Sequence, residues 1–261
     1  VTAGSGVSAQ SSNGRQVGIL DYNGDGLLDL LIVADALRAS GPTVLLKNKG
    51  GFAFEDATAA AGLPTDVHGL GLAVGDVNND GWPDIFIAGG VNTGALLQDN
   101  RNYMFISNGD STYRQLSTNV LSWAPYTRGS EDWVSGAAFG DLNRDGKLDL
   151  VVAHHFGTSA ELYDGAPLRV YMNRGLDATG NPVFEDTTAQ AGLPKIDSKA
   201  PHVEVQDFDN DGWPDIYTSV RIDTASGFSP LIFTNNGISG ADPTFSSPPI
   251  VNPYYYAGGP V

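Results

Sequence analysis

The chain has 261 residues, a formal net charge of −16 at pH 7 and a pI near 4.3. This acidity argues against nucleic acids and anionic lipids as partners, because both would be repelled. The chain contains no cysteine, which excludes disulfides, thiolate metal sites and a cysteine nucleophile, and no run of 18 apolar residues that would predict membrane insertion.

Short apolar segments predict an all-β chain. They are runs rich in Val, Ile, Leu, Phe and Tyr, bounded by Gly and Asn, which are typical of strands rather than helices. Four such segments recur in units of 55 to 66 residues, the pattern of a β-propeller with four-stranded blades. In chain order the predicted strands are 16–20, 30–34, 44–48 and 52–55; 70–74, 85–88, 103–108 and 112–116; 136–139, 150–153, 170–173 and 183–185; 203–205, 216–219, 231–235 and 244–246.

A loop with an oxygen-bearing side chain at every second residue separates the first two strands of each predicted blade. The loops are residues 21–29, 76–84, 141–149 and 207–215, and they hold 13 of the 30 acidic residues. Glycine at the sixth position permits the sharp turn that brings the oxygens of positions one, three, five and nine onto one cation. An all-oxygen set selects a hard cation, and its ligand number and flexibility favour calcium over magnesium.

We therefore predict up to four structural calcium ions. The seventh residue of each loop is expected to contribute its backbone carbonyl, and the other ligands are side chains. The predicted ligands are Asp21, Asn23, Asp25, Leu27 and Asp29; Asp76, Asn78, Asp80, Trp82 and Asp84; Asp141, Asn143, Asp145, Lys147 and Asp149; Asp207, Asp209, Asp211, Trp213 and Asp215.

The expected affinity of these loops predicts where the protein works. Extracellular calcium modules bind with a Kd of about 10⁻⁴ to 10⁻³ M, so their sites fill only where calcium is abundant. We expect a secreted protein that is extracellular or at the cell surface. Val1 opens the chain without a basic stretch or an apolar signal core, so a signal peptide would already have been removed.

A second repeated motif sets the register of the blades. Residues 54–64 and 184–194 share the pattern Phe-Glu-Asp-x-Thr-x-x-Ala-Gly-Leu-Pro, and each is expected to form one helical turn that ends at its glycine. Residues 2–7 match part of this motif, and residues 254–261 stand where the strand before another loop would be. We expect one propeller domain over residues 1–261, or a segment of a longer array that begins and ends in mid-repeat. The alternative is that residues 254–261 form a closing strand or a loose tail.

These two motifs resemble the FG-GAP/VCBS repeat superfamily of integrin-alpha-like propellers, and their combination is most similar to the ASPIC/UnbV and cartilage acidic protein family. The resemblance covers essentially the whole chain. It implies a calcium-stabilised propeller, commonly of seven blades, that is exported and used in adhesion or matrix contacts. Asn23, Asn78 and Asn143 depart from the aspartate of the family motif, which keeps an oxygen ligand but lowers the loop charge. Fewer than seven repeats are present, which leaves the blade number open.

The leading functional prediction is a non-catalytic binding or adhesion module that holds a protein or glycan ligand on a propeller face. Variable loops on a rigid scaffold would carry the ligand. One alternative is a glycan-binding lectin, or the targeting module of a polysaccharide-degrading enzyme. Another is a self-assembling fibre or surface subunit that binds copies of itself, with strand 254–261 completing a neighbour's sheet. The variable loops are residues 38–43, 90–102, 117–135, 154–167 and 221–230.

The remaining polar residues give no reason to predict an enzyme. The acids outside the loops show no spacing that singles out a catalytic pair, and neither a Gly-x-Ser-x-Gly elbow nor a phosphate loop occurs. We expect the histidines to be surface or hydrogen-bonded residues, Trp82 and Trp213 to pack between neighbouring blades, and the other aromatic clusters to pack or to contact a ligand. The residues considered were Glu131, Asp132, Glu161, Asp164 and Glu204; His68, His154, His155 and His202; Trp123, Tyr126 and Trp133; Tyr254, Tyr255 and Tyr256.

Overall fold

A computed structural model describes residues 14–35, 41–89, 102–116, 132–156, 168–193, 198–199, 202–222, 229–238 and 241–246. These residues form strands and turns without a helix, so the all-β prediction is confirmed. Among them no helical segment has the length and apolar character needed to cross a membrane. The chain divides into two compact units, Val1–Trp123 and Ala124–Val261.

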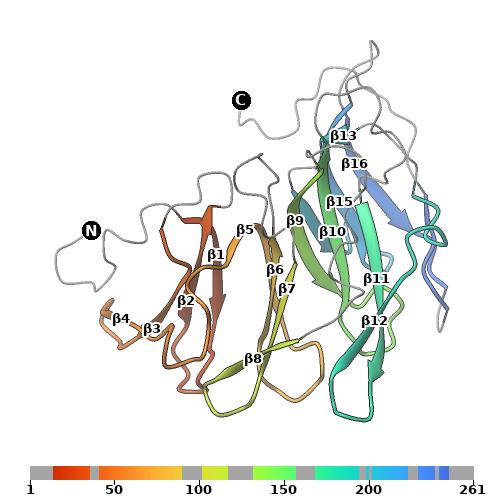
Figure 1. The fold of residues 1–261 in the computed structure, drawn as a ribbon. Helices are drawn as coiled ribbons and strands as arrows, with labels where there is room; N and C mark the ends of the chain where they lie inside the picture. Colours follow the sequence, from red (N-terminus) through yellow and green to blue (C-terminus); the bar gives the residue numbers. More distant parts are fainter. Residues whose placement is uncertain are drawn as a thin grey trace. The chain divides into compact units, whose positions relative to one another are not determined.

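The first unit contains two groups of four strands, which we call repeats 1 and 2. Within each repeat the strands pair in sequence order, and every pair is antiparallel. A short parallel contact, with Ala34 opposite His68, joins β2 to β5 and makes one eight-stranded sheet (Figure 1). Repeat 1 comprises β1 (Gly14–Leu20), β2 (Asp29–Asp35), β3 (Val44–Asn48) and β4 (Phe54–Asp56); repeat 2 comprises β5 (His68–Gly75), β6 (Asp84–Gly89), β7 (Tyr103–Ser107) and β8 (Tyr113–Leu116).

The second unit has the same organisation in repeats 3 and 4. Their strands again pair antiparallel in sequence order. One additional strand, β13 (Ser198–Lys199), pairs with both β10 and β15; the sequence analysis did not predict it. Repeat 3 comprises β9 (Asp132–Gly140), β10 (Asp149–Phe156), β11 (Leu168–Leu176) and β12 (Pro182–Asp186); repeat 4 comprises β14 (Val203–Gln206), β15 (Asp215–Ile222), β16 (Ser229–Asn235) and β17 (Phe245–Ser246).

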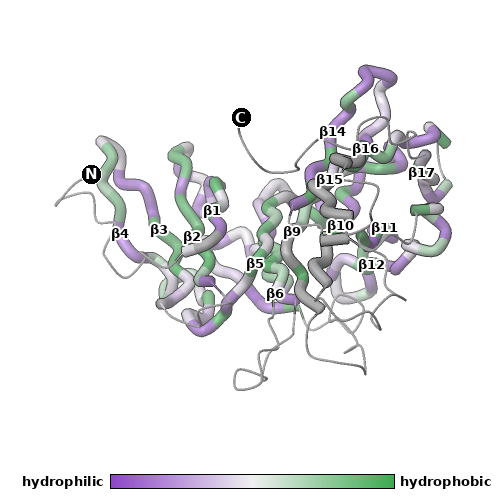
Figure 2. The backbone as a smooth tube through the Cα atoms, turned by 90° about the horizontal axis from the view of Figure 1, so that it is seen from above, coloured by the Kyte–Doolittle hydropathy of each residue, from purple (hydrophilic) through white to green (hydrophobic). Residues whose placement is uncertain are grey.

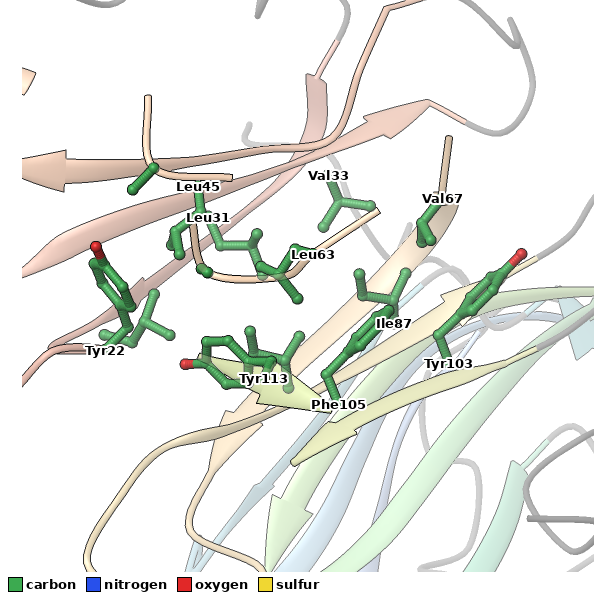
Figure 3. Packing of buried hydrophobic residues seen from close by; sticks show 14 residues of the cluster. Tyr22, Leu31, Val33, Leu45, Leu63, Val67, Ile87, Tyr103, Phe105 and Tyr113 are labelled. Carbon is green, nitrogen blue, oxygen red and sulfur yellow. The ribbon is translucent and has the colours of Figure 1, made fainter. Parts of the chain in front are cut away.

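Repeats 1 and 2 bury a common hydrophobic core between their sheet faces. Side chains alternate along a strand, so Leu31 and Val33 of β2 point to one face, and both are fully buried. Figure 3 shows them opposite Ile87 and Phe105 of repeat 2, with Leu63 from the turn after β4 between the two faces. Burial of an aliphatic side chain of this size contributes about 1.5–3 kcal/mol. In Figure 2 the tube of β2 is largely hydrophobic, in keeping with this central place.

The first strands of successive repeats pack directly against each other, β1 on β5 and β9 on β14. Glycine makes this approach possible. A Cβ on Gly18 would lie 2.9 Å from Leu72 Cδ2, and a Cβ on Gly140 would lie 2.3 Å from Val205 Cγ1. The two units therefore use the same contact between consecutive repeats.

A helical turn after the fourth strand forms a second link between consecutive repeats. In repeat 1 the amide of Ala61 donates to the carbonyl of Ala57 at 2.8 Å, and the left-handed Gly62 ends the turn, as predicted. The carbonyl of Ala61 then accepts the amide of Tyr113 in β8 at 2.9 Å. In the second unit the carbonyl of Ala191 accepts the amide of Phe245 in β17 at 3.0 Å. Each turn is thus hydrogen-bonded to the outer strand of the next repeat.

Candidate metal centres in four acidic loops

Each acidic loop connects the first and second strands of its repeat, where the sequence analysis placed it. The glycine at the sixth position is left-handed in all four loops, with φ between 80° and 91°. The fourth position is left-handed as well, which sequence reasoning missed. Gly24, Asn79, Arg144 and Asn210 occupy it, and only glycine and asparagine take that conformation readily.

The first and third side chains of every loop converge on one backbone amide. In the first loop the amide of Asp25 donates to Asp21 Oδ1 at 3.2 Å and to Asn23 Oδ1 at 2.9 Å. The other oxygen of Asp21 accepts the amide of Gly26 at 2.9 Å. The same three bonds recur in the loops that begin at Asp76, Asp141 and Asp207. The loop backbone therefore gathers these oxygens on one side.

In the fourth loop the carboxylate oxygens of Asp207, Asp209 and Asp215 lie within 4.8 Å of one another. Three carboxylates this close repel one another unless a cation lies among them. In the other three loops position three is an asparagine, whose amide oxygen stands where the fourth loop has the carboxylate of Asp209. Both donor sets fit a hard divalent cation such as calcium. The seventh-position carbonyls and the full ligand sets remain predictions.

The ninth residue of each loop is a fully buried aspartate with a second structural role. In repeat 2, Asp84 Oδ2 accepts the amide of Val77 at 3.0 Å, and Asp84 Oδ1 accepts the amide of Ser107 at 2.8 Å. One carboxylate thus ties the start of the loop to the end of the third strand. Asp29, Asp149 and Asp215 make the equivalent pairs of bonds, at 2.7–3.2 Å.

Burial raises the pKa of Asp29, Asp84 and Asp149. Desolvation raises the pKa of Asp84 to about 7, assisted by the neighbouring Asp80 and Asp76 and opposed by the two backbone hydrogen bonds. It raises the pKa of Asp149 to about 7 in the same way, and the pKa of Asp29 is also raised. In the first loop the amide of Leu27 and the Lys47 ammonium hold the pKa of exposed Asp25 below its ordinary value, against a smaller effect of desolvation. The carboxylates of one loop therefore differ in how readily they ionise.

The residue at the end of the third strand hydrogen-bonds both to the acidic loop and to the turn that follows the strand. The sequence analysis treated it only as a turn signal. Asn48 Nδ2 donates to the carbonyl of Leu28 at 2.9 Å, while Asn48 Oδ1 accepts the amide of Gly50 at 2.9 Å. Asn173 and Asn235 make equivalent bonds. In repeat 2 the strand ends at Ser107, so the predicted boundary at 108 is one residue too long. The pattern Asn-x-Gly after an apolar run was the sequence signal that could have identified this residue.

Tryptophan at the seventh position joins consecutive loops within each unit. A Cβ on Gly24 of the first loop would lie 2.8 Å from Trp82 of the second loop. The Arg144 guanidinium of the third loop lies 5.1 Å from the ring centroid of Trp213 in the fourth, within the range of a cation–π contact. The expected packing of both tryptophans between neighbouring repeats is thus present, and each candidate site has another beside it.

Several predicted features lie largely or wholly outside the described residues. These are most of the variable loops, residues 254–261, and the side chains of Trp123, Tyr126, Trp133, His154 and His155. His202 lies in the described part of the chain, where its Nε2 is 2.8 Å from Glu204 Oε1. It is therefore a hydrogen-bonded histidine, as expected.

Sequence comparison connects these loops with known repeats. A family described as FG-GAP-like repeat matches residues 10–87 and 94–152, just over half of the chain. The chain is also similar to cartilage acidic protein 1 of Mus musculus and of Homo sapiens, each 27% identical over 208 residues that span 76% of this chain. The protein of the same name in Xenopus tropicalis is 27% identical over 213 residues. The matched region spans 27–29% of the length of these relatives.

The structural comparison also gives two solved structures with limited similarity to this chain. One is an Agrocybe aegerita lectin described as recognising non-reducing terminal N-acetylglucosamine, with a TM-score of 0.47, 18% identity, and coverage of 87% of this chain and 49% of the lectin. The other is the V. cholerae biofilm matrix protein Bap1, with a TM-score of 0.40, 18% identity, and coverage of 87% and 39%.

Proposed function

This chain belongs to the FG-GAP-like repeat family, and on that premise we propose that it is a calcium-stabilised β-propeller module that binds a ligand outside the cell and catalyses no reaction. The packing of the repeats supports the propeller. Each repeat is a four-stranded antiparallel group, and its first strand lies against the first strand of the next repeat in the same unit. Blades arranged around an axis with their first strands innermost have these contacts.

The convergence of Asp207, Asp209 and Asp215 is the observation that carries the calcium proposal. A bound divalent cation would supply the positive charge that offsets repulsion among these carboxylates. Because Asp215 also bonds the amides of Phe208 and Asn235, a cation held there would stabilise the loop and two strands together. Metal binding and folding are coupled in such sites.

The extracellular location follows from the expected affinity and is supported by the relatives. Loops of this type bind calcium weakly, so they fill where calcium is abundant. The relatives are named as an acidic protein of cartilage, and this chain carries a net charge of −16. The matched region is less than a third of those proteins, so their own partners are not assigned to this chain.

Binding, rather than catalysis, is the role that this organisation supports. The acids that recur at regular spacing are accounted for as candidate cation ligands, and hydrogen bonds hold them in the loops. The segments that differ in length between repeats are connections between strands, where ligand-binding residues commonly lie. We propose a protein or a glycan as the ligand.

Calorimetric calcium titration and thermal unfolding, in calcium and in excess chelator, test the calcium proposal. We expect saturable binding and a substantially lower Tm in chelator. Asp209→Ala removes one oxygen ligand and should abolish binding at the fourth loop. Asp209→Asn places at position three the asparagine that the other three loops have there, and it should retain binding with lower affinity. An unchanged Tm in chelator together with no heat of binding would refute the proposal.

A glycan array probed with the calcium-loaded chain tests the identity of the ligand. Saturable binding to a defined sugar would identify the chain as a lectin or a targeting module. A blank array from protein with an intact thermal transition would exclude the sugars displayed and favour a protein ligand.

A further inference from the structure

The dipeptide Asn-Gly occurs at four places in the chain, residues 13–14, 23–24, 108–109 and 236–237. Asparagine in this dipeptide is prone to deamidation, because glycine has no Cβ to hinder the attack of its own backbone nitrogen on the preceding side chain. The asparagine at position 13 lies outside the described residues. The structure describes the other three dipeptides, and all of them lie outside the strands.

Backbone conformation and packing are alike at these three dipeptides. Gly24, Gly109 and Gly237 are all left-handed, with φ of 69°, 73° and 68°. A Cβ on any of them would lie 2.8–3.1 Å from a tryptophan ring, that of Trp82 for the first two and that of Trp213 for the third. Neither feature therefore distinguishes how readily the three asparagines react.

Hydrogen bonds hold both reacting nitrogens at two of the dipeptides. The side-chain nitrogen, which must leave as ammonia, donates to a threonine hydroxyl at 2.9 Å in each case. The glycine nitrogen, which must lose its proton and attack, donates to the side chain before the asparagine at 3.1–3.2 Å. Both bonds must break before the reaction. The pairs are Asn108 with Thr112 and Gly109 with Ser107, then Asn236 with Thr244 and Gly237 with Asn235.

Neither nitrogen is held in this way at Asn23. Its Nδ2 is shielded from solvent and has no hydrogen-bond partner among the described residues, where the amide of Gly24 makes no hydrogen bond either. The pKa of Asp25 is lowered most by the amide of Leu27 and least by the Asn23 side chain, so Asn23 interacts only weakly with that carboxylate. Asn23 Oδ1 accepts the amide of Asp25 at 2.9 Å, which polarises the carbonyl that is attacked. A buried donor without a partner is itself destabilising.

We propose that Asn23 is a site of spontaneous deamidation within the first acidic loop. The Gly24 nitrogen gives up its proton and bonds to Asn23 Cγ, the Cγ–Nδ2 bond breaks, and Nδ2 leaves as ammonia, which gives a five-membered succinimide. Gly24 is exposed, so water reaches this ring. Water adds to one ring carbonyl and breaks its bond to nitrogen. Attack at Cγ gives aspartate, and attack at the main-chain carbon gives isoaspartate. Water is the only co-reactant.

The asparagines at the same position of the second and third loops are less reactive. Each is followed by a residue with a Cβ, which hinders attack by the backbone nitrogen. Asn78 precedes Asn79, and its Nδ2 donates to Asp80 Oδ2 at 2.8 Å. Asn143 precedes Arg144, whose amide donates to a loop carbonyl at 3.4 Å. The first loop is therefore the one that deamidation changes.

The consequence for the first loop rests on the calcium proposal. Aspartate at position 23 gives this loop carboxylates at positions one, three, five and nine, the donor set of the fourth loop. A carboxylate accepts on both oxygens and adds one negative charge, so this product binds calcium more tightly than the asparagine form. Isoaspartate lengthens the main chain by one carbon and shortens the side chain. That product loses the converging oxygens and with them calcium binding at this loop.

Incubation of the folded chain, followed by peptide mass spectrometry, tests the proposal. Cleavage after arginine releases residues 16–38, in which Asn23 is the only asparagine. This peptide should exchange NH2 for OH at least about fivefold faster than those of Asn108 and Asn236, because each hydrogen bond that must break slows the step about 2- to 13-fold. The order should hold in calcium and in chelator, below the Tm of each. In urea the three rates should become similar.

A double variant tests whether hydrogen bonds cause the selectivity. Ser107→Ala with Thr112→Val removes both acceptors at Asn108, whose rate should rise about fivefold or more. Thermal unfolding checks that this variant is folded, and the comparison of sites in the unsubstituted chain needs no variant. If Asn23 reacts no faster than Asn108 in the folded chain, or if the folded double variant leaves the rate at Asn108 unchanged, the proposal is wrong.

Calorimetric calcium titration tests the consequence separately. Asn23→Asp supplies the aspartate product, and it should bind calcium at the first loop more tightly than the unsubstituted chain. The isoaspartate form, separated after incubation, should have one site fewer. Equal affinities of the two chains would overturn the inferred effect on calcium. An absence of any calcium binding, with the mass change at Asn23 intact, would refute the calcium proposal and leave the deamidation site standing.

Discussion

Left-handed backbone at the fourth and sixth loop positions defines these loops at the residue scale. Gly24 and Gly26 both have positive φ, at 69° and 80°, but their surroundings differ. A Cβ on Gly26 would meet nothing within 4 Å, whereas a Cβ on Gly24 would lie 2.8 Å from the ring of Trp82. Glycine is needed at position 26 for conformation alone, and at position 24 also for the packing of two consecutive loops.

Alanine at these two positions separates the two effects. Gly26→Ala should cost about 1–2 kcal/mol of unfolding free energy, the penalty of a left-handed residue with a Cβ. Gly24→Ala should cost about 1–3 kcal/mol more, because the methyl group overlaps Trp82. Urea unfolding measures both. Trp82→Leu, which places the residue type of Leu27 in the second loop, should remove the difference between the two alanine variants. A difference between the two alanine variants that is as large in the Trp82→Leu background as in the unsubstituted chain would contradict this account.

The contact between first strands is the decisive packing feature at the scale of the elements. β9 approaches β14 so closely that a Cβ on Gly140 would lie 2.3 Å from Val205 Cγ1. A Val side chain has little freedom to move aside, because its χ1 is restricted. The separation of these strands therefore depends on a missing side chain.

Gly140→Ala should lower the unfolding free energy by about 1–3 kcal/mol through overpacking. Adding Val205→Ala should recover part of that loss, because the contacting methyl group is removed. A double-mutant cycle by urea unfolding should give a coupling energy of about 0.5–3 kcal/mol. Strict additivity of the two substitutions would show that Gly140 is not limited by Val205.

At the scale of the whole molecule, negative charge is concentrated in the loops that connect the first and second strands of each repeat. The four loops hold 13 of the 30 acidic residues, and each loop ends in a buried aspartate. Asp84 and Asp149 have a pKa of about 7 in the cation-free fold because of desolvation. Calcium and protons therefore compete for the same carboxylates.

This competition predicts how the effect of calcium depends on pH. In chelator, a carboxyl with a raised pKa contributes stability that is present below the pKa of an unfolded aspartate and is lost as pH rises through about 7. Calcium binds the ionised form, so the gain in Tm from calcium should increase between about pH 5 and pH 8. Thermal unfolding with and without calcium at several pH values measures this gain. A gain that is constant over this range would contradict the pKa argument.

The sequence by itself determined the strands, their order and the four acidic loops. These features depend on short-range patterns: apolar runs for the strands, and nine-residue spacing with glycine at position six for the loops. The local hydrogen bonds from Asp25 to Asp21 and Asn23 follow from that spacing. The turn after β4 was equally predictable, because its glycine and its hydrogen bonds lie within one short segment.

Only the tertiary structure decided which residues far apart in sequence meet. It placed Trp82 beside Gly24, joined Asp84 to Ser107 across the repeat, and added β13 between β10 and β15. It also packed Leu72 and Val74 of β5 against Gly18 of β1. Local sequence patterns cannot specify these contacts, because the side chains that meet belong to segments far apart in the chain.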